Sequence, residues 1–270
     1  MTEMCIGEDW FESVDPPWTL KRLASHRHLH LIIAPHPDDD VIGAGGMMAL
    51  LARSRRPVAV VYVTSGAPAG RKCSGVARIR RMEAVKALRA VQGRAAFFLP
   101  FTSRDVREKP ACVQPVLARI ISCVRPHALY LPCPFEQHET HRTVTCMTID
   151  ALRRCTSGPC ELWGYTVWSA LPSSRLVRIV DITRAAQLKR AAIRQHKSQT
   201  ALKDYAGAIL GLNRYAAVFS SMLPDRKEVR YAEQFLDMRM LLKNRRLSIA
   251  RFAAQALVRD RGPAGVKQRP

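Results

Sequence analysis

Apolar runs with the character of buried strands alternate with stretches of helical spacing along most of the chain. The clearest strand is predicted over 57–64, a continuous apolar and β-branched run typical of a strand buried on both faces. The clearest helix is predicted over 76–92, where apolar residues recur every three or four positions until Gly93. This alternation predicts βαβ units, and therefore a mostly parallel sheet with helices on both faces.

The same patterns assign an element to most of the chain beyond residue 28. Strands are expected over 28–34, 57–64, 95–99, 127–131, 161–170 and 176–182, and helices over 47–53, 76–92, 112–124, 139–153, 184–197, 202–219 and 232–258. We expect an α/β fold, a Rossmann-like three-layer sandwich whose first five strands have the order 3-2-1-4-5, with extra C-terminal helices. No linker or repeat is visible, so we expect one domain over 1–270, with its core over 28–236 and a basic extension over 241–270.

The composition indicates a folded protein of a reducing compartment. Of the 270 residues, 47% are hydrophobic and 24% are charged, which is ordinary for a globular domain and too apolar for a disordered chain. No apolar run reaches the roughly 18 residues of a membrane span, and residues 1–20 hold acids but no bases, unlike a signal peptide. The eight cysteines form no CxxC pair. We therefore expect a cytoplasmic protein with reduced thiols.

Net charge is the unusual property of this chain. Lysines and arginines number 43 against 22 acids, which gives +21 and a general attraction for anions. Residues 241–270 hold eight of the bases and one acid. This tail fits either a solvated extension or a dedicated anion-binding segment. This charge permits peripheral contact with an anionic surface, such as a membrane.

A turn dense in metal-binding side chains follows the first predicted strand, where PHPDDD occupies 35–40. Three carboxylates this close repel one another unless a cation lies among them. His36 and Asp39 are three residues apart, so both can reach one metal from a turn, and Asp38 is left to act as a base. The alternative is an acidic turn that caps the next helix.

A second candidate follows the fourth predicted strand, where PFEQHETH occupies 134–141. His138 and His141 are three residues apart and share one face of a starting helix. The pair by itself also fits two surface histidines. In the strand order 3-2-1-4-5, however, strands one and four flank the point where the order reverses, so both turns face one crevice.

Together the two turns offer His36, Asp39 and one of the two later histidines, His138 or His141. Two imidazoles and one carboxylate with room for water form the open coordination of hydrolytic zinc, which lowers the pKa of bound water toward about 7. Asp38 would accept the proton of that water, and the remaining histidine would stabilise the oxyanion.

The sequence APHPDD at 34–39, with its later HxxH, resembles the PIG-L/LmbE-type zinc deacetylases that act on N-acetylglucosamine-like sugars. VTSG at 63–66 resembles the end of that family's second strand, and R-x-x-E-x-x-x-A at 80–87 resembles one of its helices. LNRY at 212–215 and YAEQF at 231–235 resemble its C-terminal stretch. The resemblance covers 28–236, and the His-Pro-Asp-Asp turn is its most specific part.

This resemblance implies a role for each matching residue of the two turns. It implies that His36, Asp39 and His141 bind one divalent metal, Zn²⁺ or another divalent ion. It further implies that Asp38 is the general base and that His138 polarises the acyl carbonyl. The substrate implied is a small N-acetylated amino sugar or a conjugate of one.

The resemblance also covers residues expected to contact the substrate, while some other positions differ from the family's pattern. It implies that Arg80 contacts the substrate, and that Asp105, after the third strand, matches a sugar-contacting acid. Asp40 stands where the family has Glu, and Glu139-Thr140 replaces Pro-Asp inside the usual H-P-D-H sequence.

Two other motifs suggest different kinds of site. GAGG at 43–46 suggests a dinucleotide site, but the third glycine of G-x-G-x-x-G would fall at Met48, so packing glycines are the better explanation. Asp38-x-Asp40 suggests a magnesium phosphatase with an aspartyl nucleophile, which leaves His36 and the HxxH pair unexplained.

The sequence therefore predicts a zinc-dependent hydrolase that removes an N-acetyl or similar N-acyl group from an amino-sugar-containing small molecule, glycoside or glycolipid. The alternative from another class is a basic anion- or nucleic-acid-binding protein with an inactive hydrolase-like site. The four tryptophans are too scattered to form a base-stacking surface, so no specific nucleic acid is expected.

Overall fold

The apolar run around residue 60 forms a strand that is buried along its whole length, as predicted. The computed structural model describes residues 10–14, 18–68, 75–155, 161–172, 174–219, 228–244 and 246–257. Its strands are β1 (Phe11–Ser13), β2 (His30–Ala34), β3 (Val58–Thr64), β4 (Ala95–Phe101), β5 (Ala128–Pro132), β6 (Glu161–Tyr165), β7 (Val177–Asp181) and β8 (Ala232–Asp237). Its helices are α1 (Leu20–Ala24), α2 (Asp39–Arg53), α3 (Gly75–Ala90), α4 (Ser103–Glu108), α5 (Pro110–Val124), α6 (Glu139–Arg154), α7 (Ala186–Ile193), α8 (Lys197–Thr200), α9 (Tyr205–Phe219), α10 (Arg239–Lys243) and α11 (Ile249–Leu257).

The described strands form one sheet of order β1-β4-β3-β2-β5-β6-β8-β7. The five strands β4-β3-β2-β5-β6 are parallel and have the predicted order 3-2-1-4-5. The prediction was incomplete at the edges, where β1 pairs antiparallel with β4, and β8 pairs antiparallel with both β6 and β7. Elements as short as β1, α1 and α4 were missed because too few residues carry a periodic pattern.

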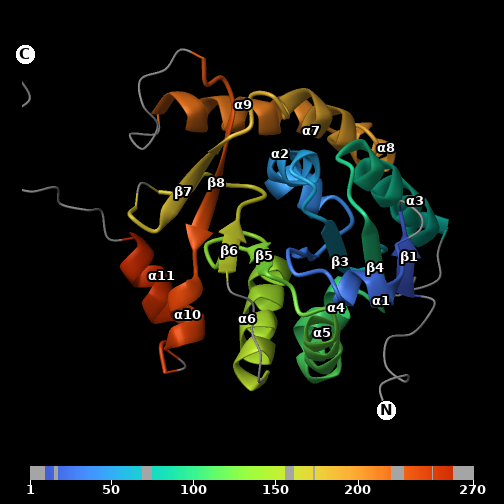
Figure 1. Cartoon of the computed structure of the whole chain (residues 1–270), viewed down its shortest axis with the longest axis vertical. Coiled ribbons are helices and arrows are strands. Elements are labelled where there is room, and N and C mark those ends of the chain that lie inside the picture. Colours follow the sequence, from blue (N-terminus) through green and yellow to red (C-terminus); the bar gives the residue numbers. More distant parts are fainter. Residues whose placement is uncertain are drawn as a thin grey trace, which may run out of the picture.

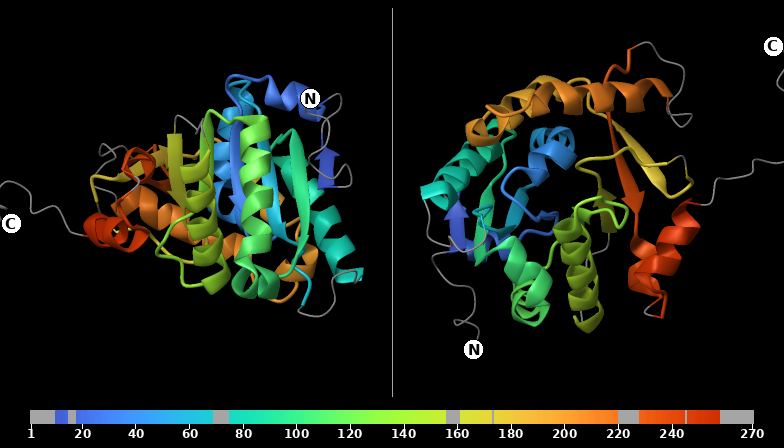
Figure 2. Two further views of the ribbon diagram at one scale, coloured as in Figure 1. Left: turned by 90° about the horizontal axis from the view of Figure 1, so that it is seen from below. Right: turned by 180° about the vertical axis from the view of Figure 1, so that it is seen from behind.

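Helices cover both faces of this sheet (Figures 1 and 2). Helices α2, α3, α7, α8 and α9 form one layer, and α1, α4, α5, α6, α10 and α11 form the other. The apolar core divides accordingly, since Leu31 and Ile33 of β2 belong to one cluster and Ile32 to the other. The predicted three-layer α/β architecture with a mostly parallel sheet is confirmed.

One predicted helix is wrong over its first residues. The segment 232–237, expected to be helical, is strand β8 and lies between β6 and β7. Its residues are buried on both faces, so the sequence shows no alternation of apolar and polar positions. Glu233 also hid the strand, because a charged residue normally marks a solvated position. In the structure this acid is fully buried and pairs with Lys189.

The first part of the basic extension packs against the fold. Leu241 and Phe252 are fully buried in the same apolar cluster as β2 and α5. The expectation of a solvated tail therefore does not hold for α10 and α11. Residues 258–270, which carry four of the eight bases, lie outside the described residues.

None of the helices in the described part of the chain is long and apolar enough to cross a bilayer. The cytoplasmic location stays a prediction.

The glycines of α2 lie where this helix touches its neighbours. A Cβ atom at Gly43 would lie 2.2 Å from the ring of Tyr165, and one at Gly46 would lie 2.6 Å from the side chain of Ile182. Both distances are far below van der Waals contact. These glycines therefore permit close packing, which confirms that interpretation over a dinucleotide site.

Replacing Gly43 by Ala tests this packing. We expect Gly43→Ala to lower the free energy of unfolding by about 1–3 kcal/mol, because Tyr165 is buried and has no room to move away. The matched control is Gly211→Ala in α9, where nothing lies within 4 Å of the added Cβ. Because alanine has a higher helix propensity than glycine, Gly211→Ala should raise the free energy of unfolding by up to about 1 kcal/mol. Urea denaturation measures both, and equal effects of the two changes would contradict the packing argument.

Candidate metal centre

The two turns predicted to share a crevice lie at the centre of the sheet. Strands β2 and β5 are parallel neighbours. The chain leaves β2 for α2 on one face of the sheet and leaves β5 for α6 on the other (Figure 1). Open parallel sheets bind ligands where neighbouring connections diverge in this way. The turn that carries His36 and the start of α6 that carries His141 meet at this point.

Three ligand atoms from these turns form a small triangle. His36 Nδ1 lies 3.1 Å from Asp39 Oδ2 and 3.2 Å from His141 Nε2. His141 Nε2 lies 3.2 Å from the same Asp39 oxygen. The backbone N–H of His36 also donates to Asp39 Oδ2 at 2.8 Å and holds the carboxylate in place. Asp39 and His141 are buried, whereas His36 is partly accessible.

These spacings fit a single divalent cation. Two ligand atoms bound to a tetrahedral zinc at about 2.0–2.1 Å are about 3.3 Å apart, close to all three edges of the triangle. Two imidazoles and one carboxylate are also a donor set that divalent transition metals favour. His36, Asp39 and His141 could therefore hold one metal ion together.

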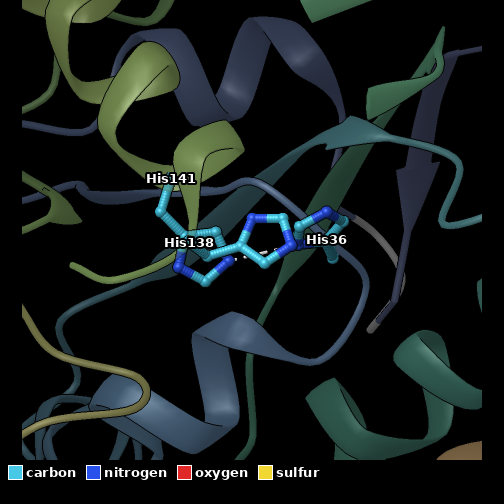
Figure 3. A group of neighbouring side chains, drawn as sticks. All are labelled: His36, His138 and His141. Atoms are coloured by element: carbon cyan, nitrogen blue, oxygen red, sulfur yellow. Dashed lines mark hydrogen bonds between the residues drawn. The ribbon is translucent and has the colours of Figure 1, made fainter. Parts of the chain in front are cut away.

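His138 belongs to a looser group. It precedes α6 at the helix N-cap and is exposed. The ligand atoms of His36, His138 and His141 lie within 4.8 Å of one another (Figure 3), which is wider than the triangle that includes Asp39. We prefer Asp39 as the third donor because its oxygen is closer to both imidazoles. His138 then lies at the rim, beside the site.

Electrostatics couple the buried members of the triangle. Burial opposes charge on His141, but the adjacent Asp39 outweighs it and raises the pKa of His141 to about 10. Burial alone would raise the pKa of Asp39, yet His141 and His36 hold it far below its usual range. The carboxylate is therefore ionised and attracts positive charge. Burial, with the neighbouring His36 and His141, lowers the pKa of His138.

Glu136 orients His141 and was not assigned a role from the sequence. Its Oε2 lies 3.3 Å from His141 Nδ1, and its Oε1 accepts the backbone N–H of Val167 at 2.7 Å. With Nδ1 facing Glu136, His141 turns its Nε2 toward His36 and Asp39. The signal in the sequence was an acid five residues before a candidate ligand, directly after a buried strand.

Asp38 is held beside the triangle by Arg80. The Arg80 guanidinium donates to Asp38 Oδ2 at 2.9 Å and to the carbonyl of Gly66 at 3.1 Å. Gly66 has a φ of +67°, and a Cβ there would lie 2.7 Å from the guanidinium. The VTSG turn therefore needs glycine at this position to let Arg80 approach. A substrate contact by Arg80 stays a prediction.

Asp40 points away from the triangle into the core. Its Oδ2 accepts the hydroxyl of Tyr62 at 2.8 Å. Burial raises the pKa of Asp40 to about 7. The shorter Asp, where the family has Glu, thus supports the first turn of α2 from behind and does not join the ligand atoms.

Asp105 caps a helix at the edge of the site. Its Oδ2 accepts the backbone N–H of Thr102 at 2.9 Å and the Thr102 hydroxyl at 2.7 Å, which closes a capping box on α4. The capped turn places Ser103 Oγ 3.1 Å from His36 Nε2. Sequence reasoning missed Ser103, since a lone serine carries no signal. The sugar contact expected of Asp105 stays a prediction.

The segment that carries the site is similar to a known protein family. Residues 31–152 match the family model described as PIG-L: GlcNAc-PI de-N-acetylase. This range includes all seven residues that the sequence singled out, from His36 to His141. No curated protein sequence matches the chain significantly.

Solved proteins with the same fold have different activities. The N,N'-diacetylchitobiose deacetylase of Pyrococcus horikoshii is 24% identical, with a TM-score of 0.65 over 84% of this chain and 90% of that one. A zinc-inhibited form of teicoplanin deacetylase is 16% identical, with a TM-score of 0.60 over 77% and 97%. The 4-carboxy-2-hydroxymuconate hydratase of Pseudomonas putida is 19% identical, with a TM-score of 0.61 over 78% and 96%.

All three identities are below 25%, so these likenesses establish the fold and leave the reaction open. The family model, in addition, matches the segment that carries both motifs. Residues 31–152 are therefore similar to the PIG-L de-N-acetylase family, in line with the resemblance carried by the His-Pro-Asp-Asp turn and the HxxH pair.

Proposed function

We propose that the chain is a divalent-metal-dependent hydrolase that removes an N-acetyl or similar N-acyl group from an amino sugar, free or carried on a glycoside or glycolipid. The observation that carries the proposal is the buried triangle of His36 Nδ1, Asp39 Oδ2 and His141 Nε2, with edges of 3.1–3.2 Å, and Asp38 beside it. The PIG-L family match over 31–152 supports the amide-hydrolase reaction.

The triangle would hold the metal ion, with zinc as the proposed ion. When bound, such an ion lowers the pKa of water and withdraws electrons from a carbonyl oxygen. The teicoplanin enzyme is known in a zinc-inhibited form, so the metal-binding experiments below compare zinc with other divalent ions.

Asp38 is proposed as the general base. Its carboxylate is partly exposed, is adjacent in sequence to a proposed ligand, and accepts a hydrogen bond from Arg80 on Oδ2. Arg80 holds the carboxylate in place, so that the other oxygen can accept a proton from the attacking water. A base that is positioned in this way contributes about 10²–10⁴-fold to a rate.

His138 is proposed to stabilise the negative charge that develops on the acyl oxygen. It is exposed at the rim, close to His36 and His141, so it can reach a substrate that enters from solvent. A donor aimed at that oxygen acts most strongly when charge appears, in the tetrahedral transition state.

A hydratase shares this fold, so the fold alone does not select amide hydrolysis. The amide substrate is inferred from the family match and from the deacetylases among the structural relatives. The other expectation, a nucleic-acid-binding protein with an inactive site, has no specific observation in its favour among the described residues. Release of acetate by the purified protein decides among these possibilities.

Changing the base tests the proposed chemistry. We expect Asp38→Asn to lower acetate release from N-acetylated amino sugars by about a hundredfold or more, because the amide cannot accept the proton. Metal content should stay unchanged, since Asn can still accept from Arg80. Acetate assay and elemental analysis measure the two effects. Full activity of Asp38→Asn would rule out this base.

Removing a ligand tests the metal site. We expect His141→Ala to purify without metal and to fail to regain it from zinc, cobalt or manganese solutions, because only two donors remain. His127→Ala is the matched control, since His127 lies at the opposite end of β5 and should leave the metal content unaltered. Equal metal content in both variants would contradict the assignment.

The role of Glu136 is tested by metal affinity alone. We expect Glu136→Gln to weaken binding by about 10–100-fold, because the amide no longer accepts the His141 N–H as strongly. Glu83→Gln is the control, a buried glutamate that binds Ser198. Competition with a coloured chelator gives both dissociation constants. An unchanged affinity in Glu136→Gln would show that Glu136 only tethers Val167.

A further inference from the structure

Helix α9 exposes an apolar stripe to solvent. Val218 is 64% exposed and Phe219 is 70% exposed, and the ring of Phe219 packs on that of Tyr215, which is 55% exposed. Leu202, just before the helix, is 80% exposed. The residues that α9 leaves exposed recur at helical spacing: Gly207, Ala208, Gly211, Arg214, Tyr215, Val218 and Phe219.

This stripe differs from the outer face of an ordinary surface helix. Such a face is normally rich in charges of both signs, whereas here Arg214 is its sole charged member among the described residues of α9. Tyr215, Val218 and Phe219 lie together near the C-terminal end of α9, and the rings of Tyr215 and Phe219 are in contact. Clustered apolar side chains mark an interaction surface more often than isolated ones do.

The helical layer around this stripe is strongly basic. Between 182 and 219 the chain has seven lysines and arginines and one acid, Asp204. Lys189 is buried against Glu233, and the exposed bases are Arg184, Arg194, Lys197, Lys203 and Arg214. Asp204 accepts the backbone N–H of Gly207 near the start of α9. The outer surface of α7, α8 and α9 (top of Figure 1) thus combines positive charge with exposed apolar side chains.

We propose that α9, with the bases of α7 and α8, docks on the surface of an anionic phospholipid bilayer. Val218 and Phe219 would enter the boundary between headgroups and acyl chains, and the lysines and arginines would lie among the phosphates. Basic residues beside an apolar helix face are the combination that binds such interfaces. The surface predicted for peripheral contact thereby includes the helical layer and is not confined to the C-terminal tail.

Other occupants fit this surface less well. A second copy of the chain that packs α9 against α9 would bring two basic layers together, with Asp204 as the one acid of 182–219 in each copy to pair them. A nucleic acid would use the bases but would leave Leu202, Val218 and Phe219 against a charged backbone. An anionic bilayer satisfies the charge and the apolar side chains together.

The stripe continues toward the candidate metal centre. Tyr205, the first residue of α9, contacts Trp168 edge-to-face, with ring centroids 5.6 Å apart. Trp168 is 46% exposed and follows Val167, whose N–H is bound by Glu136 beside His141. Docking through α9 would therefore place the site next to lipid. The docking proposal itself does not depend on the proposed deacetylase activity.

Vesicle binding by the full chain tests the proposal. Sedimentation with phosphatidylcholine vesicles, with and without phosphatidylserine, compares the unchanged protein with the double variant Val218→Glu, Phe219→Glu. We expect the unchanged protein to bind phosphatidylserine vesicles and to bind them less at high salt. The affinity of the double variant for these vesicles should be lower by about tenfold or more, because two apolar side chains no longer enter the interface. Met240→Glu, at a 45% exposed methionine of α10 on the other side of the sheet, should bind like the unchanged protein.

A milder variant guards against misfolding. Val218→Ala with Phe219→Ala keeps helix propensity and should show a smaller loss in the same direction, with circular dichroism unchanged. Equal vesicle binding by the unchanged protein and both double variants would overturn the proposal. So would a dimer that becomes monomeric in the glutamate variant, or a variant that loses affinity for duplex DNA while it still binds vesicles.

Discussion

Attraction between one buried carboxylate and two imidazoles organises the rest of this structure. Asp39 Oδ2 lies within 3.2 Å of His36 Nδ1 and His141 Nε2, in a place with almost no access to solvent. A buried ionised carboxylate is costly unless positive charge compensates it. The attraction between Asp39 and the two imidazoles therefore holds the two turns together. A cation bound among these atoms would stabilise both turns.

Buried partners behind the triangle limit how it can move. Glu136 holds His141, and Tyr62 holds Asp40, the residue that follows Asp39. The hydroxyl of Tyr165 donates to the carbonyl of Ile33 at 2.8 Å and ties β6 to β2. The Tyr165 contact joins a strand on one side of the switch point to a strand on the other. The geometry of the candidate site thus depends on the sheet order itself.

Helix α2 carries the first turn and is fixed by the layer that also carries the basic surface. Glu233 of β8 accepts the N–H groups of Gly46 and Met47 at 2.8 Å and the ammonium group of Lys189 at 2.7 Å. Lys189 belongs to α7, so α7, α2 and the sheet meet at one buried ion pair. A membrane contact on α9 would thereby be connected to the first turn through packed, hydrogen-bonded elements.

The sequence by itself determined the features that depend on neighbouring residues. The apolar run of β3, the helical periods of α3 and α5, and the His-Pro-Asp-Asp turn are visible locally. The order of the five parallel strands was expected from the Rossmann-like arrangement that alternating strands and helices favour. Tertiary structure alone decided the features that depend on pairing across the chain. These include β8, whose burial on both faces hid its period, the bond from Val167 that fixes Glu136, and the approach of Ser103 to His36. The physical reason is that periodicity records which side of an element is buried, whereas hydrogen bonds between distant residues exist only once the sheet has assembled.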